Sequence, residues 1–192
     1  MIIPGSKSTI SDLREIRRQC WDIDLAAHVR RGGFVLGLCG GYQMLGTHIH
    51  DPQGLEGKAE SVDGLGLLAV ETTLLPDKTL TRVSATHVPT GTAIDGYEIH
   101  LGKTEGVDCK RPFAMIGGTP DGAISPSGRV MGTYLHGCFT ADNFRESYLK
   151  AIGAQSISIA FDSLIEDTLN ALAAHLETHI DIDKLIALAE PV

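Results

Sequence analysis

The 192-residue chain has few cysteines, no long apolar run and a deficit of positive charge. No segment approaches the roughly 18 consecutive apolar residues that a membrane-spanning helix needs. Sixteen Lys and Arg against 24 Asp and Glu give a net charge of −8, which argues against a free-standing nucleic-acid binder, because phosphate contacts need a basic surface. We therefore expect neither a membrane nor a nucleic acid as partner.

The cysteines indicate a reducing compartment. Four of them, at positions 20, 39, 109 and 138, form no CxxC pair and are too few for a disulfide framework, so we expect thiols and a cytoplasmic protein. The N-terminus, MIIPGSKSTI, lacks the charged and apolar regions of a signal peptide. With 43% hydrophobic and 21% charged residues, the length suits one globular domain.

Short apolar runs between glycine-rich turns predict an α/β protein with an open, mostly parallel sheet flanked by helices. Strands are expected at 1–3, 34–38, 95–101, 113–116 and 130–135, and one or two helices between residues 13 and 29. From residue 143 the pattern is helical again. We expect one domain over 1–147, with C-terminal helices over 148–192 packed on the same core.

Gly37-Leu38-Cys39-Gly40-Gly41 follows a predicted buried strand and precedes a predicted helix. Small residues on both sides of a cysteine meet the steric requirement of a nucleophile elbow, a tight turn that holds its central residue in a strained conformation. The positive end of the following helix would favour the thiolate form of Cys39. Cys20, beside Trp21, is expected in the core.

A cysteine nucleophile needs a proton carrier, and His136 is the best placed histidine. It ends a predicted strand and lies in a glycine-flanked turn, where its ring can reach a neighbouring strand's end. His48 and His50 with Asp51 are weak as metal ligands, and we interpret them as a surface turn. We assign no metal site. The other histidines are at 28, 87, 100, 175 and 179.

GLCGGYQMLG, with IIPGSKST upstream and DGYEIHLGKT and GTYLHGCF downstream, resembles the class I (triad-type, flavodoxin-like) glutamine amidotransferase domain, in the branch found in cobyric acid synthases. The resemblance runs through nearly the whole chain. It implies that Cys39 attacks the side-chain amide of glutamine and that His136 carries the proton to departing ammonia. It further implies that Gln43 contacts bound glutamine, and that backbone N–H groups of Gly40 and Gly5 form the oxyanion hole.

One position departs from the family pattern. Triad amidotransferases carry a glutamate two residues beyond the histidine, where this chain has Cys138. Either a dyad acts here, or another carboxylate orients His136. Glu98 is the candidate carboxylate, although it could equally be a polar strand residue.

The resemblance also implies a larger enzyme. Cobyric acid synthases amidate peripheral carboxylates of adenosylcobyrinic acid a,c-diamide in cobalamin biosynthesis, using glutamine-derived ammonia and ATP. We expect no cofactor in this domain, ATP and Mg²⁺ only in a synthetase domain or subunit, and contact with the corrin only through that partner. The sheet is expected to begin one or two strands before Met1.

Three alternatives stay open at this point. The same architecture serves cobyrinic acid a,c-diamide synthase and the enzyme pair that amidates lipid II. A degenerate, non-catalytic subunit that only binds a partner is the third.

Overall fold

The computed structural model describes residues 1–155 and 160–189, without the side chains of 77–79, and within these ranges the strands form two sheets. The four-stranded sheet has the order β1-β2-β10-β9. Strands β1, β2 and β10 run parallel, and β9 pairs antiparallel with β10. The bounds are Ile2–Ile3 for β1, Val35–Leu38 for β2, Ala123–Ile124 for β9 and Val130–Thr133 for β10.

The seven-stranded sheet is mainly antiparallel and has the order β11-β6-β5-β3-β4, with β7 paired to β5 and β8 paired to β7. The long strands Val70–His87 (β5) and Ala93–Gly106 (β6) form its centre as a hairpin. The shorter strands are His48–Asp51 (β3), Glu60–Asp63 (β4), Ala114–Ile116 (β7), Thr119–Asp121 (β8) and Leu135–His136 (β11). The predicted open α/β sheet is therefore present, and its parallel pairs are β1–β2 and β2–β10 in the four-stranded sheet and β3–β5 in the seven-stranded sheet.

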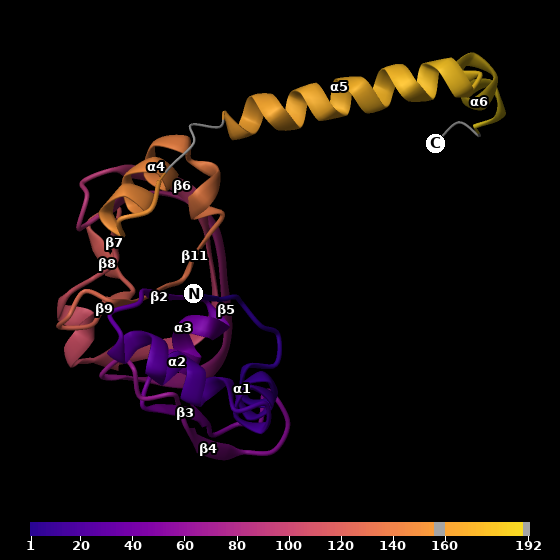
Figure 1. Ribbon diagram of the computed structural model, residues 1–192. Helices are drawn as coiled ribbons and strands as arrows, with labels where there is room; N and C mark the ends of the chain where they lie inside the picture. Colours follow the sequence, from indigo (N-terminus) through magenta and orange to yellow (C-terminus); the bar gives the residue numbers. More distant parts are fainter. Residues whose placement is uncertain (156–159, 190–192) are drawn as a thin grey trace.

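Helices cover both faces of the four-stranded sheet, as buried parallel strands require. Val35 of β2 joins a core cluster with α1, α2 and α3, whereas the next residue, Leu36, joins a second cluster with α4. The helices are Thr9–Arg18 (α1), Trp21–Arg30 (α2), Gly40–Leu45 (α3) and Asp142–Ala151 (α4), with 3-10 turns at Val107–Lys110 and Cys138–Thr140 (Figure 1).

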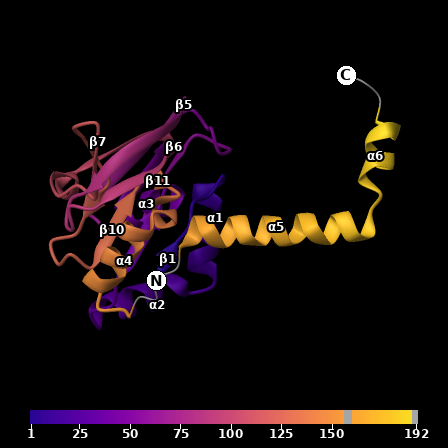
Figure 2. The same ribbon diagram turned by 90° about the horizontal axis from the view of Figure 1, so that it is seen from above.

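The C-terminal helices differ from the prediction that they pack on the core. The predicted boundary at 147/148 falls inside α4, which does pack on the domain through Phe144 and Tyr148. Helix α5 (Phe161–His179) has no buried residue and extends away from the domain, followed by α6 (Ile182–Leu188) (Figures 1 and 2). The apolar stripe of α5, which the sequence predicted to pack on the core, is about half-exposed, with Leu169 at 53%. The stripe consists of Ile165, Leu169, Leu172 and Leu176. None of the described helices is both long and apolar enough to cross a membrane.

Gly132 of β10 has a defined packing role beneath α3. A Cβ at this position would lie 2.0 Å from a ring carbon of Tyr42, whose side chain is 1% exposed. We predict that Gly132→Ala lowers the free energy of unfolding by about 1–3 kcal/mol, because overpacking a closed core forces side chains off their rotamers. Denaturant unfolding measures this loss. The double variant Gly132→Ala/Tyr42→Leu should lose less than the two single losses added, and additive losses would contradict the account.

Candidate active site

Cys39 lies in a strained turn at the carboxyl end of β2. Its φ of 51° and ψ of −112° are unusual for a residue with a side chain. The backbone N–H of Cys39 donates to the carbonyl of Thr133 at 2.9 Å. A Cβ on Gly41 would lie 2.1 Å from the Ile3 carbonyl oxygen, and one on Gly37 would lie 2.6 Å from the Gly41 carbonyl oxygen. The turn therefore requires glycine at both positions.

His136 ends the short strand β11, which follows β10 after one residue. Strand β10 pairs in parallel with β2 so that Thr133 is opposite Leu38, and Cys39 and His136 therefore both lie beyond the carboxyl ends of these two adjacent strands. A Cβ on Gly5 would lie 3.2 Å from the ring carbon Cε1 of His136 and 3.5 Å from Cβ of Cys39. The turn at Gly5 thus closes over both side chains.

The electrostatic environment of His136 favours the neutral ring. Burial lowers the pKa of His136 below 6.5, and the backbone carbonyl of Ile99 partly opposes this shift. Its Nε2 is buried and has no hydrogen-bond partner among the residues that the structure describes. A neutral imidazole nitrogen without a protein partner, beside a cysteine, can exchange a proton with a bound molecule.

A cleft of about 500 Å³ opens over these two residues. Gln43 forms part of its wall and is 3% exposed. Its side-chain amide donates to the Leu101 carbonyl at 3.1 Å and to the Tyr134 hydroxyl at 3.3 Å, and its oxygen accepts from the Thr9 hydroxyl at 3.3 Å. The cleft is lined by Gly5, Ser6, Lys7, Thr9, Cys39, Gln43, Glu56, Leu74, Ile99, His100, Leu101 and His136.

Glu56 and Lys7 give the same cleft one acidic and one basic side chain. A carboxylate oxygen of Glu56 accepts from the backbone N–H of Ile10, in the first turn of α1, at 2.9 Å. The backbone N–H of Glu56 donates to the buried carboxylate of Asp51 at 2.9 Å. Asp51 therefore holds the loop that carries Glu56, and this structural role replaces the surface turn expected at 48–51.

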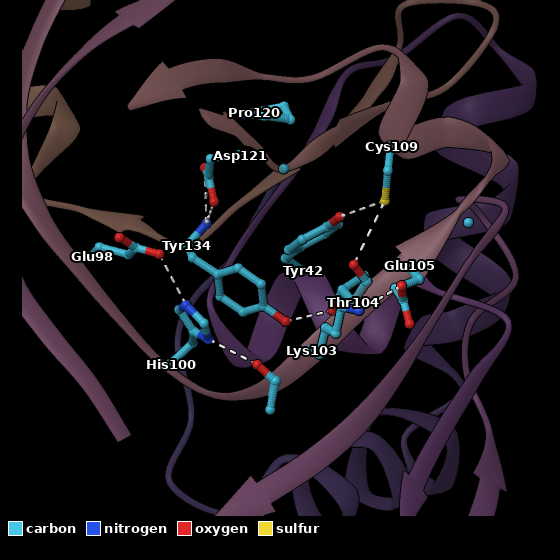
Figure 3. A pocket seen from close by; sticks show the side chains of 13 residues that line it. Tyr42, Glu98, His100, Lys103, Thr104, Glu105, Cys109, Pro120, Asp121 and Tyr134 are labelled. Carbon is cyan, nitrogen blue, oxygen red and sulfur yellow. Dashed lines mark hydrogen bonds and ion pairs between the residues drawn. The ribbon is translucent and has the colours of Figure 1, made fainter. Parts of the chain in front are cut away.

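The carboxylate of Glu98, the candidate for orienting His136, contacts a different histidine in the structure. Glu98 Oε1 lies 3.1 Å from Nε2 of His100, two residues along β6. His100 Nδ1 lies 3.0 Å from the Gly102 carbonyl oxygen, and its ring stacks on Tyr134 with centroids 4.2 Å apart. Glu98 and His100 line a second cavity of about 450 Å³, and His100 also lines the cleft of Cys39 (Figure 3).

The other cysteines lack the surroundings of Cys39. Cys138 is 1% exposed, and burial raises the pKa of its thiol to about 11. Burial also raises the pKa of Cys109, whose sulfur lies 3.7 Å from the Tyr42 hydroxyl. Cys20 is exposed, and Trp21 is 54% exposed, so the prediction of a core position was wrong. Both residues lie at the junction of α1 and α2, where Cys20 has φ of 59°.

His48 and His50 lie on strand β3, where their rings stack at 5.8 Å. Both lie within 3.4 Å of carboxylate oxygens of Glu71, and His48 also of Asp63. Among the described residues no group of three or more His, Cys, Asp or Glu side chains is arranged to hold a metal ion.

Sequence reasoning did not find Glu56, Thr9 or the carbonyls of Ile99 and Leu101. Backbone carbonyls leave no signal in a sequence. Glu56 does lie in a DPQGLEG segment, but its approach to α1 depends on a fold that brings residues 46 positions apart together.

Comparison with known proteins decides the family. The model of the CobB/CobQ-like glutamine amidotransferase domain matches residues 1–144. The chain belongs to this family. It is 57% identical to a cobyric acid synthase of Cereibacter sphaeroides over 98% of this chain and 39% of the relative. It is 59% identical to one from Jannaschia sp., over 97% of this chain and 38% of the relative. The chain thus spans about two fifths of the length of these curated relatives.

Among solved structures, the chain is similar to one described as a crystal structure of glutamine amidotransferase. The TM-score is 0.55 at 19% identity, over 80% of this chain and 78% of the other. This likeness supports the α/β fold. The family assignment rests on the sequence matches. The family model and the curated relatives together identify a glutamine amidotransferase domain of the cobyric acid synthase type.

Proposed function

We propose that this domain hydrolyses glutamine to glutamate and ammonia, with Cys39 as nucleophile and His136 as proton carrier. One observation carries the proposal: the strained Cys39 and the partly buried His136 line one cleft beyond the carboxyl ends of the adjacent parallel strands β2 and β10. A histidine beside a cysteine activates the thiol, and a turn with glycines on both sides leaves the sulfur accessible to an amide carbon.

The reaction takes two steps. The sulfur of Cys39 bonds to the side-chain amide carbon of glutamine, and His136 passes the thiol proton to the amide nitrogen as the carbon–nitrogen bond breaks. Ammonia leaves, and a γ-glutamyl thioester remains. Water then attacks the thioester, with His136 taking a proton from the water and returning it to the sulfur as glutamate leaves.

The close approach of the Gly5 turn to the start of α3 supports an oxyanion hole between them. A Cβ on Gly40 would lie 2.9 Å from the backbone nitrogen of Ser6, so the two backbone segments approach closely over Cys39. We assign the oxyanion hole to the N–H groups of Gly5 and Gly40, because rigid backbone donors stabilise charge that develops during the reaction.

The zwitterionic end of glutamine needs one acidic and one basic partner. Glu56 and Lys7 supply these charges in the same cleft as Cys39. We assign Glu56 to the α-ammonium group and Lys7 to the α-carboxylate. The three hydrogen bonds of Gln43 fix its amide in the cleft wall, where it would contact the bound substrate.

In the full-length protein we propose that the ammonia serves the cobyric acid synthase reaction, the ATP-dependent amidation of peripheral carboxylates of adenosylcobyrinic acid a,c-diamide. Identity of 57% to cobyric acid synthases across nearly the whole chain supports this assignment. A synthetase portion would bind ATP, Mg²⁺ and the corrin. We also propose a cytoplasmic location, since an exposed thiol at Cys20 suits a reducing compartment.

The nucleophile can be tested by covalent labelling. We predict that a glutamine analogue with a diazoketone warhead, 6-diazo-5-oxonorleucine, labels Cys39, and that Cys39→Ala abolishes both labelling and glutamine hydrolysis. Peptide mass spectrometry locates the label. Cys20→Ala is the matched control and should keep both activities, because Cys20 is exposed at the α1–α2 junction. Label on Cys138 would contradict the assignment.

The proton carrier can be tested by the pH dependence of hydrolysis. Burial lowers the pKa of His136, so its neutral form persists below pH 6.5. Since kcat/KM reports on ionisations of the free enzyme, its decline on the acid side should have an apparent pKa below 6.5. His136→Asn should lower kcat/KM by roughly 10²- to 10⁴-fold. A decline centred above 6.5, or an active His136→Asn variant, would show that another group carries the proton.

A further inference from the structure

Glu98 and His100 occupy the partition between the two cavities. They lie two residues apart on β6, so their side chains leave the same face of the strand. Figure 3 shows Glu98 reaching toward the ring of His100, with Tyr134 beside it. His100 lines both cavities, whereas Glu98 lines the one without Cys39.

Both nitrogens of the His100 ring face oxygen acceptors. Nε2 lies 3.1 Å from a carboxylate oxygen of Glu98, and Nδ1 lies 3.0 Å from the Gly102 carbonyl. A carbonyl oxygen can only accept, so Nδ1 carries a proton and donates it to the Gly102 carbonyl. A second hydrogen bond joins Nε2 to the carboxyl group of Glu98, and the ring stacks on Tyr134.

The backbone around His100 contacts the glutamine site directly. The carbonyl of Ile99 accepts a hydrogen bond from the thiol of Cys39 at 3.2 Å. The same carbonyl raises the pKa of His136, against the larger lowering by burial. The carbonyl of Leu101 accepts from the amide of Gln43 at 3.1 Å. These two carbonyls lie on either side of His100 in the chain. Between them they interact with Cys39, His136 and Gln43.

The ladder between β5 and β6 is interrupted directly after this segment. The pairing of β5 with β6 is irregular between Thr73 and Lys78, opposite residues 101–103. Gly102 has φ of +98°, and a Cβ there would lie 2.3 Å from the Thr73 carbonyl oxygen. A β-bulge disrupts the ladder locally and bends the strand, so a side-chain contact across it adds a further constraint on the backbone. The bond from His100 to the Gly102 carbonyl spans this irregular stretch.

We propose that Glu98 and His100 are a positioning pair for the glutamine site, fixing the Ile99 and Leu101 carbonyls against Cys39, His136 and Gln43. The pair acts through the backbone of β6 and takes no part in the bond-breaking steps. Glu98 was considered as a direct hydrogen-bond partner that orients His136. Here it would instead help to position His136 indirectly, through the Ile99 carbonyl. This inference rests on the proposed role of Cys39 as nucleophile.

The test compares Glu98→Ala with Glu98→Gln in the 192-residue chain. A glutamine side chain can still hydrogen-bond to Nε2 of His100, whereas alanine cannot. We expect Glu98→Ala to slow both kcat for glutamine hydrolysis and the rate of Cys39 labelling by 6-diazo-5-oxonorleucine by about 10- to 100-fold. Glu98→Gln should stay close to the wild-type rates. His100→Ala and His100→Gln repeat the comparison from the other side.

Glu105 is the matched control. It pairs with Lys103 at 2.8 Å on the same strand and at the same two-residue spacing, but both side chains are largely exposed, at 70% and 65%. Glu105→Ala should leave both rates unchanged. Thermal unfolding of each variant checks the fold, and if Glu98→Ala fails to fold, the two His100 variants decide the question by the same comparison.

Two results would overturn the positioning pair. Equal losses in Glu98→Ala and Glu98→Gln would mean that the charge of Glu98 acts on His136 itself. Wild-type rates in Glu98→Ala would mean that the pair has no role in the site. Failure of the proposed function is distinguishable, because the label would then lie on a cysteine other than Cys39 in the unmodified chain.

Discussion

Parallel pairing of β2 with β10 brings together two residues that are 97 positions apart in the chain. Leu38 lies opposite Thr133, and the N–H of Cys39 donates to the Thr133 carbonyl, so the sharp turn after β2 begins in register with the end of β10. Side chains that follow these strands meet at one edge of the sheet. Helices on both faces bury the strands and make the register rigid. The cleft, the strained turn at Cys39 and the position of His136 all depend on this contact.

The elements nearest this contact were predictable because their signals are local. An apolar run followed by Cys39 between glycines specifies a strand and a tight turn, and steric contacts at Gly37 and Gly41 explain those glycines. His136 was predictable because it also ends a buried strand. The flanking β5–β6 hairpin was visible only in part, since its irregular pairing depends on contacts between residues far apart in sequence.

The errors have physical causes. Glu98 has the right chemistry to orient a histidine, but strand geometry places His100, two residues away, within its reach. Cys20 is followed by the apolar Trp21 in the sequence, yet the chain breaks into two helices at that position and exposes it. The stripe of α5 indicates an amphipathic helix, but a stripe does not specify the surface that covers it, and here the stripe remains exposed. Position in the fold, rather than residue type, decided each case.

The central claim is that glutamine is hydrolysed through a covalent bond to Cys39, and rapid acid quenching followed by mass spectrometry tests it most directly. Acid preserves thioesters, so peptides from the quenched reaction report where the substrate was attached. The account predicts a γ-glutamyl adduct on the peptide that contains Cys39, and its loss in the presence of hydroxylamine, which cleaves thioesters. An adduct on another residue, or glutamate release with no adduct at any quench time, would contradict it.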